Sequence, residues 1–299
     1  MASLISTWRF SQCGVDAAAV ALSSSCSSTE AVEIGVKTVE LDESVTSAGY
    51  GGLPNAEGVL QLDAAIMTSS GRIGSVMALT GYKSSIDIAH AVLQHSRHPI
   101  LVGDGAALFA QQRGFQNTED LLTPHAYLRY HEFLASKSSE PEYHRNDGMT
   151  HSDTVGMIAR DSSGAITAGC ATSGMQFKSV GRVGDSPIVG AGLFASGSGA
   201  AVASGDGDKL IRFCLAFLTV ERMKTGHSAI EACRHTISRV KAVDPTCQAA
   251  IAAMSADGEV GAASTHDGFN VVVWRDGMKH SEIRPVKGET DIRWIHTCV

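Results

Sequence analysis

A polar segment near the middle of the chain divides this sequence into two apolar halves. Residues 136–153 carry serines, charged side chains and one proline, and almost no side chain that a core could bury. This composition is typical of an exposed linker. Apolar residues resume directly after residue 153, and each half is short of a complete core. We therefore predict a single domain over residues 1–299, interrupted by the linker.

The hydrophobic patterns predict strand hairpins that alternate with blocks of helices. Helices are expected at 13–40 with a break at 23–28, and at 85–95, 106–112, 123–137, 207–222 and 227–242; strands are expected at 59–67, 73–79, 100–102, 154–160, 166–170, 249–254, 260–264 and 269–274. Where the second helix begins, Ser28 or Thr29 is expected as the N-cap, with Glu33 near the capping-box position. Because strands pair locally and helices come in blocks, the sequence predicts an α+β fold, an antiparallel sheet covered by helices, not a doubly wound βαβ fold.

Composition narrows the classes of partner and compartment. The net charge of -7 and the pI near 5.9 provide no basic surface for nucleic acid. No apolar run reaches the roughly 18 residues typical of a membrane-spanning helix, so no membrane partner is expected. Seven cysteines without CxxC spacing favour reduced, buried thiols. The N-terminal apolar stretch is too short for a signal peptide. A cytoplasmic location is expected for the chain as written, and a lysosomal or secreted one if the N-terminus is incomplete.

Thr154 begins the apolar strand that follows the linker. A threonine hydroxyl is a weak nucleophile unless a base lies beside it. The residue's own α-amino group can serve as that base, because a pKa of roughly 7.7–8.0 leaves a useful neutral fraction at pH 7. This requires a cut between Asp153 and Thr154. The alternative is an ordinary threonine at the edge of a strand.

Arg182 and Asp185 lie three residues apart in a glycine-flanked loop. Arginine binds a carboxylate through two parallel hydrogen bonds, and aspartate accepts an ammonium group. Together the two side chains suit the α-carboxylate and the α-amino group of an amino acid. The alternative is a surface ion pair between them.

Motifs that could hold a nucleotide or a metal are incomplete. The glycine-rich stretches 181–192 and 197–207 lack the GxxxxGK[ST] pattern. Two Gly-Asp-Gly motifs lack the glutamate at position twelve of a calcium loop. His90, His95 and His98 lie near one predicted helix end, without further ligands at a zinc-like spacing. We therefore expect no cofactor and no metal.

Several motifs, in order along the chain, resemble the glycosylasparaginase (aspartylglucosaminidase) family of N-terminal nucleophile hydrolases. They are Ser6-Thr7-Trp8-Arg9-Phe10, Gly49-Tyr50-Gly51-Gly52, Leu62-Asp63-Ala64, Leu101-Val102-Gly103-Asp104-Gly105-Ala106, Asp153-Thr154-Val155-Gly156-Met157, Thr172-Ser173-Gly174-Met175 and Gly181-Arg182-Val183-Gly184-Asp185-Ser186-Pro187-Ile188. The likeness covers nearly the whole chain. It favours the nucleophile hypothesis for Thr154 over the strand-edge one.

The resemblance implies a four-layer αββα sandwich and self-cleavage between Asp153 and Thr154 by an N-to-O acyl shift, with His151 near the scissile bond. The products would be an alpha chain, 1–153, and a beta chain, 154–299, held together as a heterodimer, with two heterodimers forming a dimer. Thr154 would then attack the side-chain amide carbon of a glycosylated asparagine. The resulting aspartyl ester would release the amino sugar and be hydrolysed by water.

The resemblance also implies roles for residues around the nucleophile, in catalysis and in substrate binding. Thr172 would support the nucleophile, Ser204 and the N–H of Gly205 would form the oxyanion hole, Arg182, Asp185 and Gly207 would hold the amino-acid end, Trp8 and Phe10 would line the mouth, and Ser47 would lie close to the nucleophile.

Two positions depart from the family pattern. Ser152 separates His151 from Asp153 where the family reads His-Asp-Thr, and this displacement bears on the speed of self-cleavage. Ser204 stands where the family usually has threonine, so the hydroxyl is kept on a side chain that rotates more freely.

Two alternative functions are a related hydrolase activity and a non-catalytic binding role. Plant-type asparaginases and isoaspartyl peptidases are relatives that usually have glycine before the nucleophilic threonine. Asp153, Met157 and Met175 favour the glycosylasparaginase side, with activity on plain asparagine as the alternative. An uncleaved, non-catalytic binding protein is the third hypothesis. The Ser152 insertion supports it, and the complete set of candidate site residues opposes it.

Overall fold

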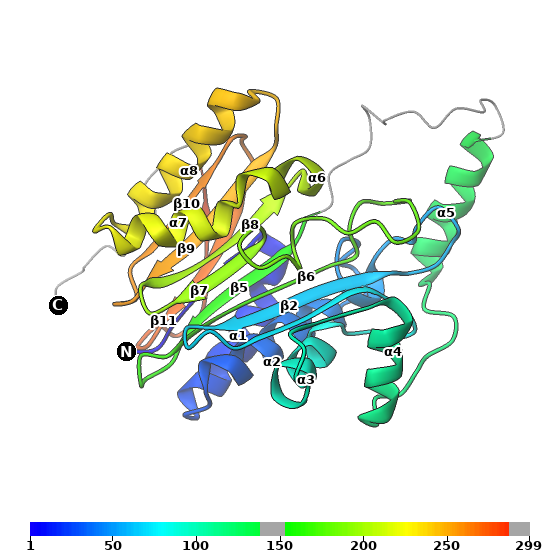
Figure 1. The fold of residues 1–299 in the computed structure, drawn as a ribbon, viewed down its shortest axis with the longest axis horizontal. Helices are drawn as coiled ribbons and strands as arrows, with labels where there is room; N and C mark the ends of the chain where they lie inside the picture. Colours follow the sequence, from blue (N-terminus) through cyan, green and yellow to red (C-terminus); the bar gives the residue numbers. More distant parts are fainter. Residues whose placement is uncertain (138–152, 287–299) are drawn as a thin grey trace.

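The computed structural model describes residues 1–137 and 153–286. Over these ranges the strands form two sheets whose outer faces carry helices (Figure 1). The architecture is mixed α+β, as the sequence predicts. Most of the predicted linker, 138–152, and the last residues, 287–299, lie outside the described residues.

The larger sheet has eight strands. Their order is β12 (Glu282–Pro285), β11 (Asn270–Arg275), β1 (Ser3–Thr7), β5 (Val155–Arg160), β6 (Ile166–Thr172), β2 (Leu62–Thr68), β3 (Ile73–Leu79) and β4 (Ile100–Val102). Neighbours are antiparallel except β3 and β4, which run parallel. This edge pair departs from the predicted antiparallel pattern, because a helix between the two strands returns the chain across the sheet before β4 begins.

The smaller sheet packs face to face on the larger one. Its antiparallel order is β10 (Val260–Ser264), β9 (Ala249–Ser255), β8 (Gly199–Gly205) and β7 (Leu193–Ser196). A buried apolar core between the sheets includes Ile5, Ile158, Leu193, Val202 and Phe269. Strands β5 and β8 touch across this core, so residues from both sheets can meet at one end of it.

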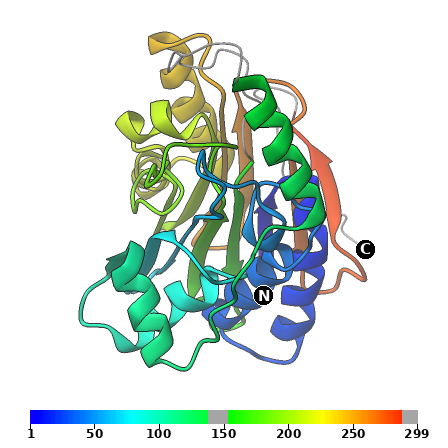
Figure 2. The same ribbon diagram turned by 90° about the vertical axis from the view of Figure 1, so that its right-hand side faces the viewer.

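Helices cover both outer faces. They are α1 (Gln12–Ser23), α2 (Ser28–Glu40), α3 (Ile86–His95), α4 (Gly103–Gln112), α5 (Pro124–Lys137), α6 (Gly207–Leu210), α7 (Leu215–Lys224) and α8 (Ala229–Val243). Helices α1 to α3 pack on the larger sheet, and α7 and α8 on the smaller one, on the opposite side of the molecule (Figures 1 and 2). The sheets are thus shielded from water on both sides.

The N-cap of α2 lies one residue before the first predicted candidate. Ser27, not Ser28 or Thr29, is the N-cap, and Glu30 closes the capping box where Glu33 was expected. Ser28 is engaged elsewhere: its N–H donates to Asp161 (2.9 Å), and its hydroxyl lies 3.0 Å from that of Thr167. Tertiary contacts with the hairpin of β5 and β6 therefore set the start of this helix.

The predicted helix 207–222 is broken. A short α6 is followed by a 3₁₀ turn at Ile211–Phe213, and α7 begins only after Cys214, whose φ of 48° is left-handed. The turn redirects the chain so that α7 packs on β7 and β8. No glycine or proline marks this break in the sequence.

Only some of the described cysteines are buried, although the sequence favours buried thiols. Cys170, Cys233 and Cys247 are buried thiols, whereas Cys13 and Cys214 are exposed. Within the described ranges, none of the helices is long and apolar enough to cross a bilayer.

Candidate functional site

Thr154 lies immediately before β5, at the end of the core between the two sheets, and is only 4% exposed. The antiparallel register of β5 and β6 pairs Val155 with Ala171. Continued by one residue, it places Thr172 opposite Thr154. On the other side of β5, β1 runs alongside and ends at Thr7.

A different hydroxyl side chain contacts each polar atom of Thr154. The Thr7 hydroxyl donates to the Thr154 carbonyl oxygen (2.6 Å), and the Thr154 N–H donates to Oγ of Ser204 (3.2 Å). The Thr154 hydroxyl lies 2.8 Å from Oγ of Ser186. Thr7 also accepts the N–H of Gly156 (2.8 Å), which ties β1 to the start of β5. The backbone and the hydroxyl of Thr154 are therefore both fixed.

Trp8 holds the Ser204 hydroxyl. Its indole N–H donates to Oγ of Ser204 (2.9 Å), and its ring packs edge-on against Phe269 with centroids 5.0 Å apart. Trp8 has a φ of 64°, an uncommon value for a residue with a side chain. Because Oγ accepts from both Trp8 and Thr154, the hydrogen of Ser204 is left to donate to another group. The freer rotation expected of a serine here is thus restrained by two donors. Gly205 follows Ser204 at the end of β8.

The Thr172 hydroxyl contacts backbone groups. It donates to the carbonyl oxygen of Ser47 (3.2 Å) and accepts the N–H of Gly174 (2.9 Å). Ser47 also accepts the N–H of Ser173 (2.8 Å), so the Ser47 loop is joined to the end of β6. Within the described residues, the hydroxyl that contacts Oγ1 of Thr154 is that of Ser186, and Thr172 contacts the Ser47 and Gly174 backbone.

Arg182, Asp185 and Gly207 converge, but not as the surface ion pair considered from the sequence. Nε of Arg182 bonds the Asp208 carboxylate (2.8 Å), whereas Oδ2 of Asp185 is buried without a hydrogen-bond partner. A Cβ on Gly207 would lie 2.8 Å from Oδ1 of Asp185 and 3.3 Å from Nη2 of Arg182. Only a glycine leaves this space between the two charged groups open.

Burial raises the pKa of Asp185 to about 7, against an ordinary value near 3.8. Nearby Arg182 opposes this rise but does not cancel it. A buried carboxylate with one unpartnered oxygen is unfavourable as an ion unless a cation approaches. The position therefore suits a ligand ammonium group.

Asp153 is partly buried, and its burial raises its carboxyl pKa to about 6. It directly precedes Thr154, so a carboxyl group lies beside the peptide bond that the sequence singles out. His151 and Ser152 lie outside the described residues.

Phe10 does not share an environment with Trp8. It packs against the core between α1, α2 and the larger sheet, whereas Trp8 packs against the core between the sheets. The two aromatic side chains therefore do not form one wall.

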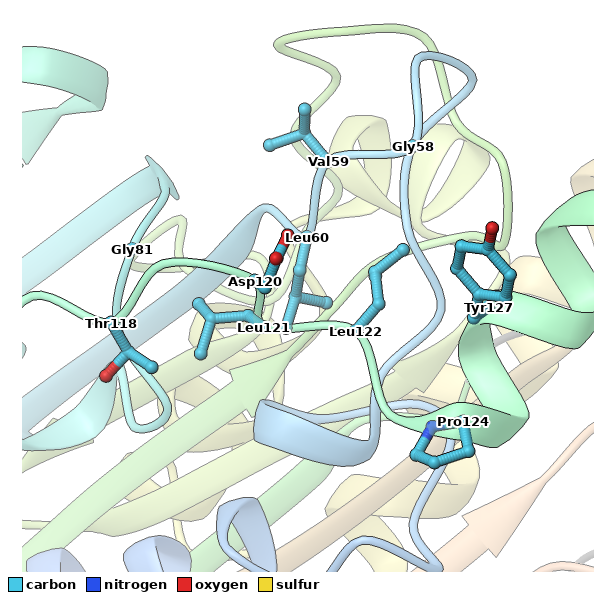
Figure 3. Close-up of a pocket in the computed structure, with 10 residues that line it drawn as sticks. All are labelled: Gly58, Val59, Leu60, Gly81, Thr118, Asp120, Leu121, Leu122, Pro124 and Tyr127. Atoms are coloured by element: carbon cyan, nitrogen blue, oxygen red, sulfur yellow. The ribbon is translucent and has the colours of Figure 1, made fainter.

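A surface cavity of about 610 Å³ lies elsewhere, between the 58–60 loop, the 118–122 segment and the start of α5 (Figure 3). Leu60, Leu121, Leu122 and Tyr127 contribute to its lining, and no candidate site residue does. The candidate functional site is therefore the group of hydroxyl side chains around Thr154 and not this cavity.

The histidine cluster considered from the sequence does not assemble a metal site. Nδ1 of His90 contacts the Glu33 carboxylate at 2.6 Å. No group of three or more potential metal ligands is found within residues 1–137 and 153–286.

Comparison with known families gives a match over almost the whole chain. The model of a family described as asparaginase matches residues 5–282. The chain belongs to the asparaginase family. The match spans both sides of the linker, including every candidate site residue.

Relatives within the asparaginase family carry a more specific name. The chain is 40% identical over 279 residues to an N(4)-(Beta-N-acetylglucosaminyl)-L-asparaginase of Elizabethkingia miricola, covering 90% of this chain and 80% of the relative. It is 36% identical over 291 residues to the Mus musculus protein of that name, covering 87% and 83%. A Rattus norvegicus protein of that name is 36% identical over 290 residues, with the same coverage.

Three contacts in this asparaginase-family site escaped the sequence argument. Thr7 sits in a short strand whose polar residues conceal its burial. Ser186 lies inside a recognised motif, directly after Asp185, where the charged neighbour draws attention. Asp208 ends the sequence Gly205-Asp206-Gly207-Asp208, which resembles part of a calcium loop and gives no sign of a contact with Arg182. In each case the sequence contains the residue, and only the fold supplies its partner.

Proposed function

We propose that the protein hydrolyses the amide bond of N4-(β-N-acetylglucosaminyl)-L-asparagine. The observation that carries this proposal is the buried Thr154 hydroxyl in contact with Ser186, whose sequence neighbour Asp185 has an unpartnered carboxylate oxygen suited to an amino-acid ammonium group. The names of the relatives supply the sugar-linked substrate.

Self-cleavage between Asp153 and Thr154 is the first step. In an N-to-O acyl shift, Oγ1 of Thr154 attacks the Asp153 carbonyl carbon, the C–N bond breaks, and the hydroxyl proton passes to the departing nitrogen, which becomes the α-amino group. Water then hydrolyses the ester to the Asp153 carboxylate and the free Thr154 hydroxyl. The chain becomes residues 1–153 and 154–299, with a free α-amino group on Thr154. The two pieces would stay associated, because β1 of the first lies hydrogen-bonded between β5 and β11 of the second.

The fold expected for this chemistry is the four-layer αββα sandwich of N-terminal nucleophile hydrolases. Packing of α1 to α3 on the larger sheet, the sheets on each other, and α7 and α8 on the smaller sheet supports it. The nucleophile then lies at a strand end between the sheets.

Substrate binding begins at the amino-acid end. Arg182 would hold the α-carboxylate, Asp185 the α-ammonium group, and Gly207 would leave room for both contacts. Since Asp208 occupies Nε of Arg182, the Nη edge of the guanidinium is available to the carboxylate. Ser47 lies beside Thr172, and Trp8, which bonds Ser204, would line the mouth of the site.

Hydrolysis then follows from the geometry at Thr154. Its α-amino group accepts the proton of Oγ1 while Oγ1 bonds the amide carbon. The carbonyl electron pair moves to oxygen, where the Ser204 hydroxyl and the Gly205 N–H would stabilise it by about 3 kcal/mol each. The C–N bond breaks with protonation of the leaving amino sugar, and water releases aspartate.

Hydrolysis of plain asparagine or β-aspartyl peptides is a second candidate. It is favoured by the same residues, because Arg182, Asp185 and Gly207 would contact only the amino-acid portion. The family description, asparaginase, is also compatible with it.

Steady-state kinetics with glycoasparagine, asparagine and a β-aspartyl dipeptide test the proposal. A kcat/KM at least tenfold higher for glycoasparagine is expected. A preference for either other substrate assigns the second function. No turnover of any of them by cleaved protein contradicts both.

A further inference from the structure

The hydroxyl of Ser186 contacts the oxygen of Thr154 on which the proposed chemistry depends. The two oxygens are 2.8 Å apart, near the optimal length of an O–H···O hydrogen bond. Both residues are buried, Ser186 at 2% exposure and Thr154 at 4%. We propose that Ser186 is a positioning residue that fixes the Thr154 hydroxyl for attack; this inference rests on the proposed function of Thr154.

The backbone around Ser186 is held on several sides. Ser186 precedes Pro187, which restricts it to extended conformations. The Pro187 carbonyl oxygen accepts a hydrogen bond from the buried hydroxyl of Ser75 in β3 (2.9 Å). The Ile188 N–H donates to the backbone carbonyl oxygen of Asp185 (2.9 Å). Gly192 packs so closely that a Cβ there would lie 2.5 Å from Cα of Ser186. The hydroxyl is therefore presented from a rigid turn, as positioning requires.

The two hydroxyls have different roles once the reaction starts. In the substrate-free state either one can donate. During attack the Oγ1–carbon bond forms, the carbonyl pair moves to oxygen, and the Oγ1 proton passes to the α-amino nitrogen. In the ester Oγ1 has no hydrogen, so Ser186 must be the donor. Ser186 neither gains nor loses a proton in any step.

The donor becomes most useful when the ester breaks. As water attacks, the carbon–Oγ1 bond breaks and negative charge develops on Oγ1 before the α-ammonium returns its proton. A hydrogen bond from Ser186 strengthens as this charge develops, so it contributes to the transition state more than to substrate binding. The loss of Ser186 should therefore appear in kcat and leave KM nearly unchanged.

Ser173 supplies a matched control. It is also a buried serine beside the site, at 1% exposure, but its hydroxyl oxygen has no hydrogen-bond partner. Ser173→Ala removes the same atom from the same neighbourhood without touching Thr154. It separates the hydrogen bond of Ser186 from a general effect of deleting a buried hydroxyl.

The experiment measures the fraction cleaved at 153–154 by intact mass after short expression, together with kcat and KM for glycoasparagine. For Ser186→Ala we expect slower cleavage and a kcat lower by roughly tenfold, with KM within about twofold of wild type. Ser186→Thr should recover most of the loss, and Ser173→Ala should stay within about twofold of wild type.

Unchanged cleavage and kcat in Ser186→Ala overturn the inference. A raised KM with normal kcat overturns it too, because that result would mean that Ser186 supports substrate binding by the neighbouring Asp185 and does not position the nucleophile. If the alanine variant does not fold, Ser186→Cys decides: it keeps the volume with a weaker donor, so wild-type kcat contradicts the inference. A wild type that cleaves itself but leaves glycoasparagine intact refutes the proposed substrate. The fraction cleaved at 153–154 in Ser186→Ala, compared with that in the wild type, then still decides the role of Ser186.

Discussion

At the scale of single residues, neutral hydroxyl groups contact Thr154, and the charged groups Asp185 and Arg182 belong to the loop that carries Ser186. Thr7, Ser186 and Ser204 each bond one polar atom of Thr154. A neutral surrounding suits a nucleophile whose base is its own amino group, because a nearby carboxylate would raise the pKa of that amine. The charged groups are then reserved for substrate binding.

Trp8→Phe should lower kcat for glycoasparagine roughly tenfold, because the indole donor that orients Ser204 is lost. Hydrolysis of plain asparagine, measured in parallel, should fall by a similar factor, since the oxyanion hole serves both substrates. A loss confined to the glycosylated substrate would instead show that Trp8 acts only through the sugar.

Asp185→Asn should change how stability depends on pH. The pKa of Asp185 rises from an ordinary 3.8 to about 7 on folding, so the folded state binds its proton more tightly and wild-type stability falls as pH rises between these values. The cost is on the order of 4 kcal/mol at pH 8. Melting temperatures of both proteins from pH 4 to 8 should therefore diverge in favour of the variant toward alkaline pH. Parallel curves would contradict the buried, partnerless carboxylate.

Substrate affinity should share this pH dependence. A substrate ammonium group favours the ionised form of Asp185, so KM of the wild type should rise as pH falls below about 7. The measurement is KM from pH 5 to 8 with glycoasparagine. A flat profile would place the ammonium group elsewhere.

Asp208→Asn should raise KM roughly threefold without changing kcat, because the acid that orients Arg182 is half exposed and such pairs contribute modestly. Asp244→Asn, which removes the partner of Arg212, is the control and should leave KM unchanged. Equal KM values for both variants would show that Arg182 needs no such support.

At the scale of elements, a buried carboxylate joins α2 to α3. Glu40 accepts hydrogen bonds from the hydroxyls of Ser84 and Ser85 (2.7 and 2.5 Å) and from the N–H groups of Ser85 and Ile86 (2.9 and 3.1 Å). These satisfy the first turn of α3 from the end of α2. Helix α2, which carries Glu40, also contacts the 3₁₀ turn Gly49–Gly51, and this turn follows Ser47 in the sequence.

Glu40→Ala should therefore lower the free energy of unfolding by about 3 kcal/mol, since it leaves several buried donors without partners. Denaturant titration is the measurement. Glu132→Ala, which removes an exposed partner of Arg129, should cost less than about 0.5 kcal/mol. Similar losses in the two variants would mean that Glu40 is not a structural anchor.

Most elements with clear apolar periodicity could be predicted from the sequence, and some that lack it could not. The hairpin of β2 and β3 and the helices α3 and α8 lie close to their predicted ranges. Strands β7 and β8 were missed because Gly199–Gly205 is mostly glycine and alanine, with low strand propensity; burial between β7 and β9 holds it. The residues that the sequence assigned to the site are largely brought together, but their hydrogen-bond partners depend on packing between distant strands.

At the scale of the whole molecule, the site requires both sides of the linker. Thr7 ends the first strand, Trp8 directly follows it, and Thr154 directly precedes β5. Ser186 lies in the loop before β7, and Ser204 lies in β8 of the smaller sheet. Strands β1 and β5, which lie on either side of the polar segment 136–153 in the sequence, pair in the larger sheet. After a cut between residues 153 and 154, the contacts of Thr7 with Thr154 and of Trp8 with Ser204 would join two chains.

In the proposed reaction, Thr154 itself makes this cut. The direct test is the intact mass of purified wild-type protein beside a Thr154→Ala variant. We predict two fragments from the wild type, beginning at Met1 and Thr154, and one chain of 31.3 kDa from the variant. A wild type that stays whole under the same conditions, with or without deletion of Ser152, would contradict the account and favour an uncleaved binding protein.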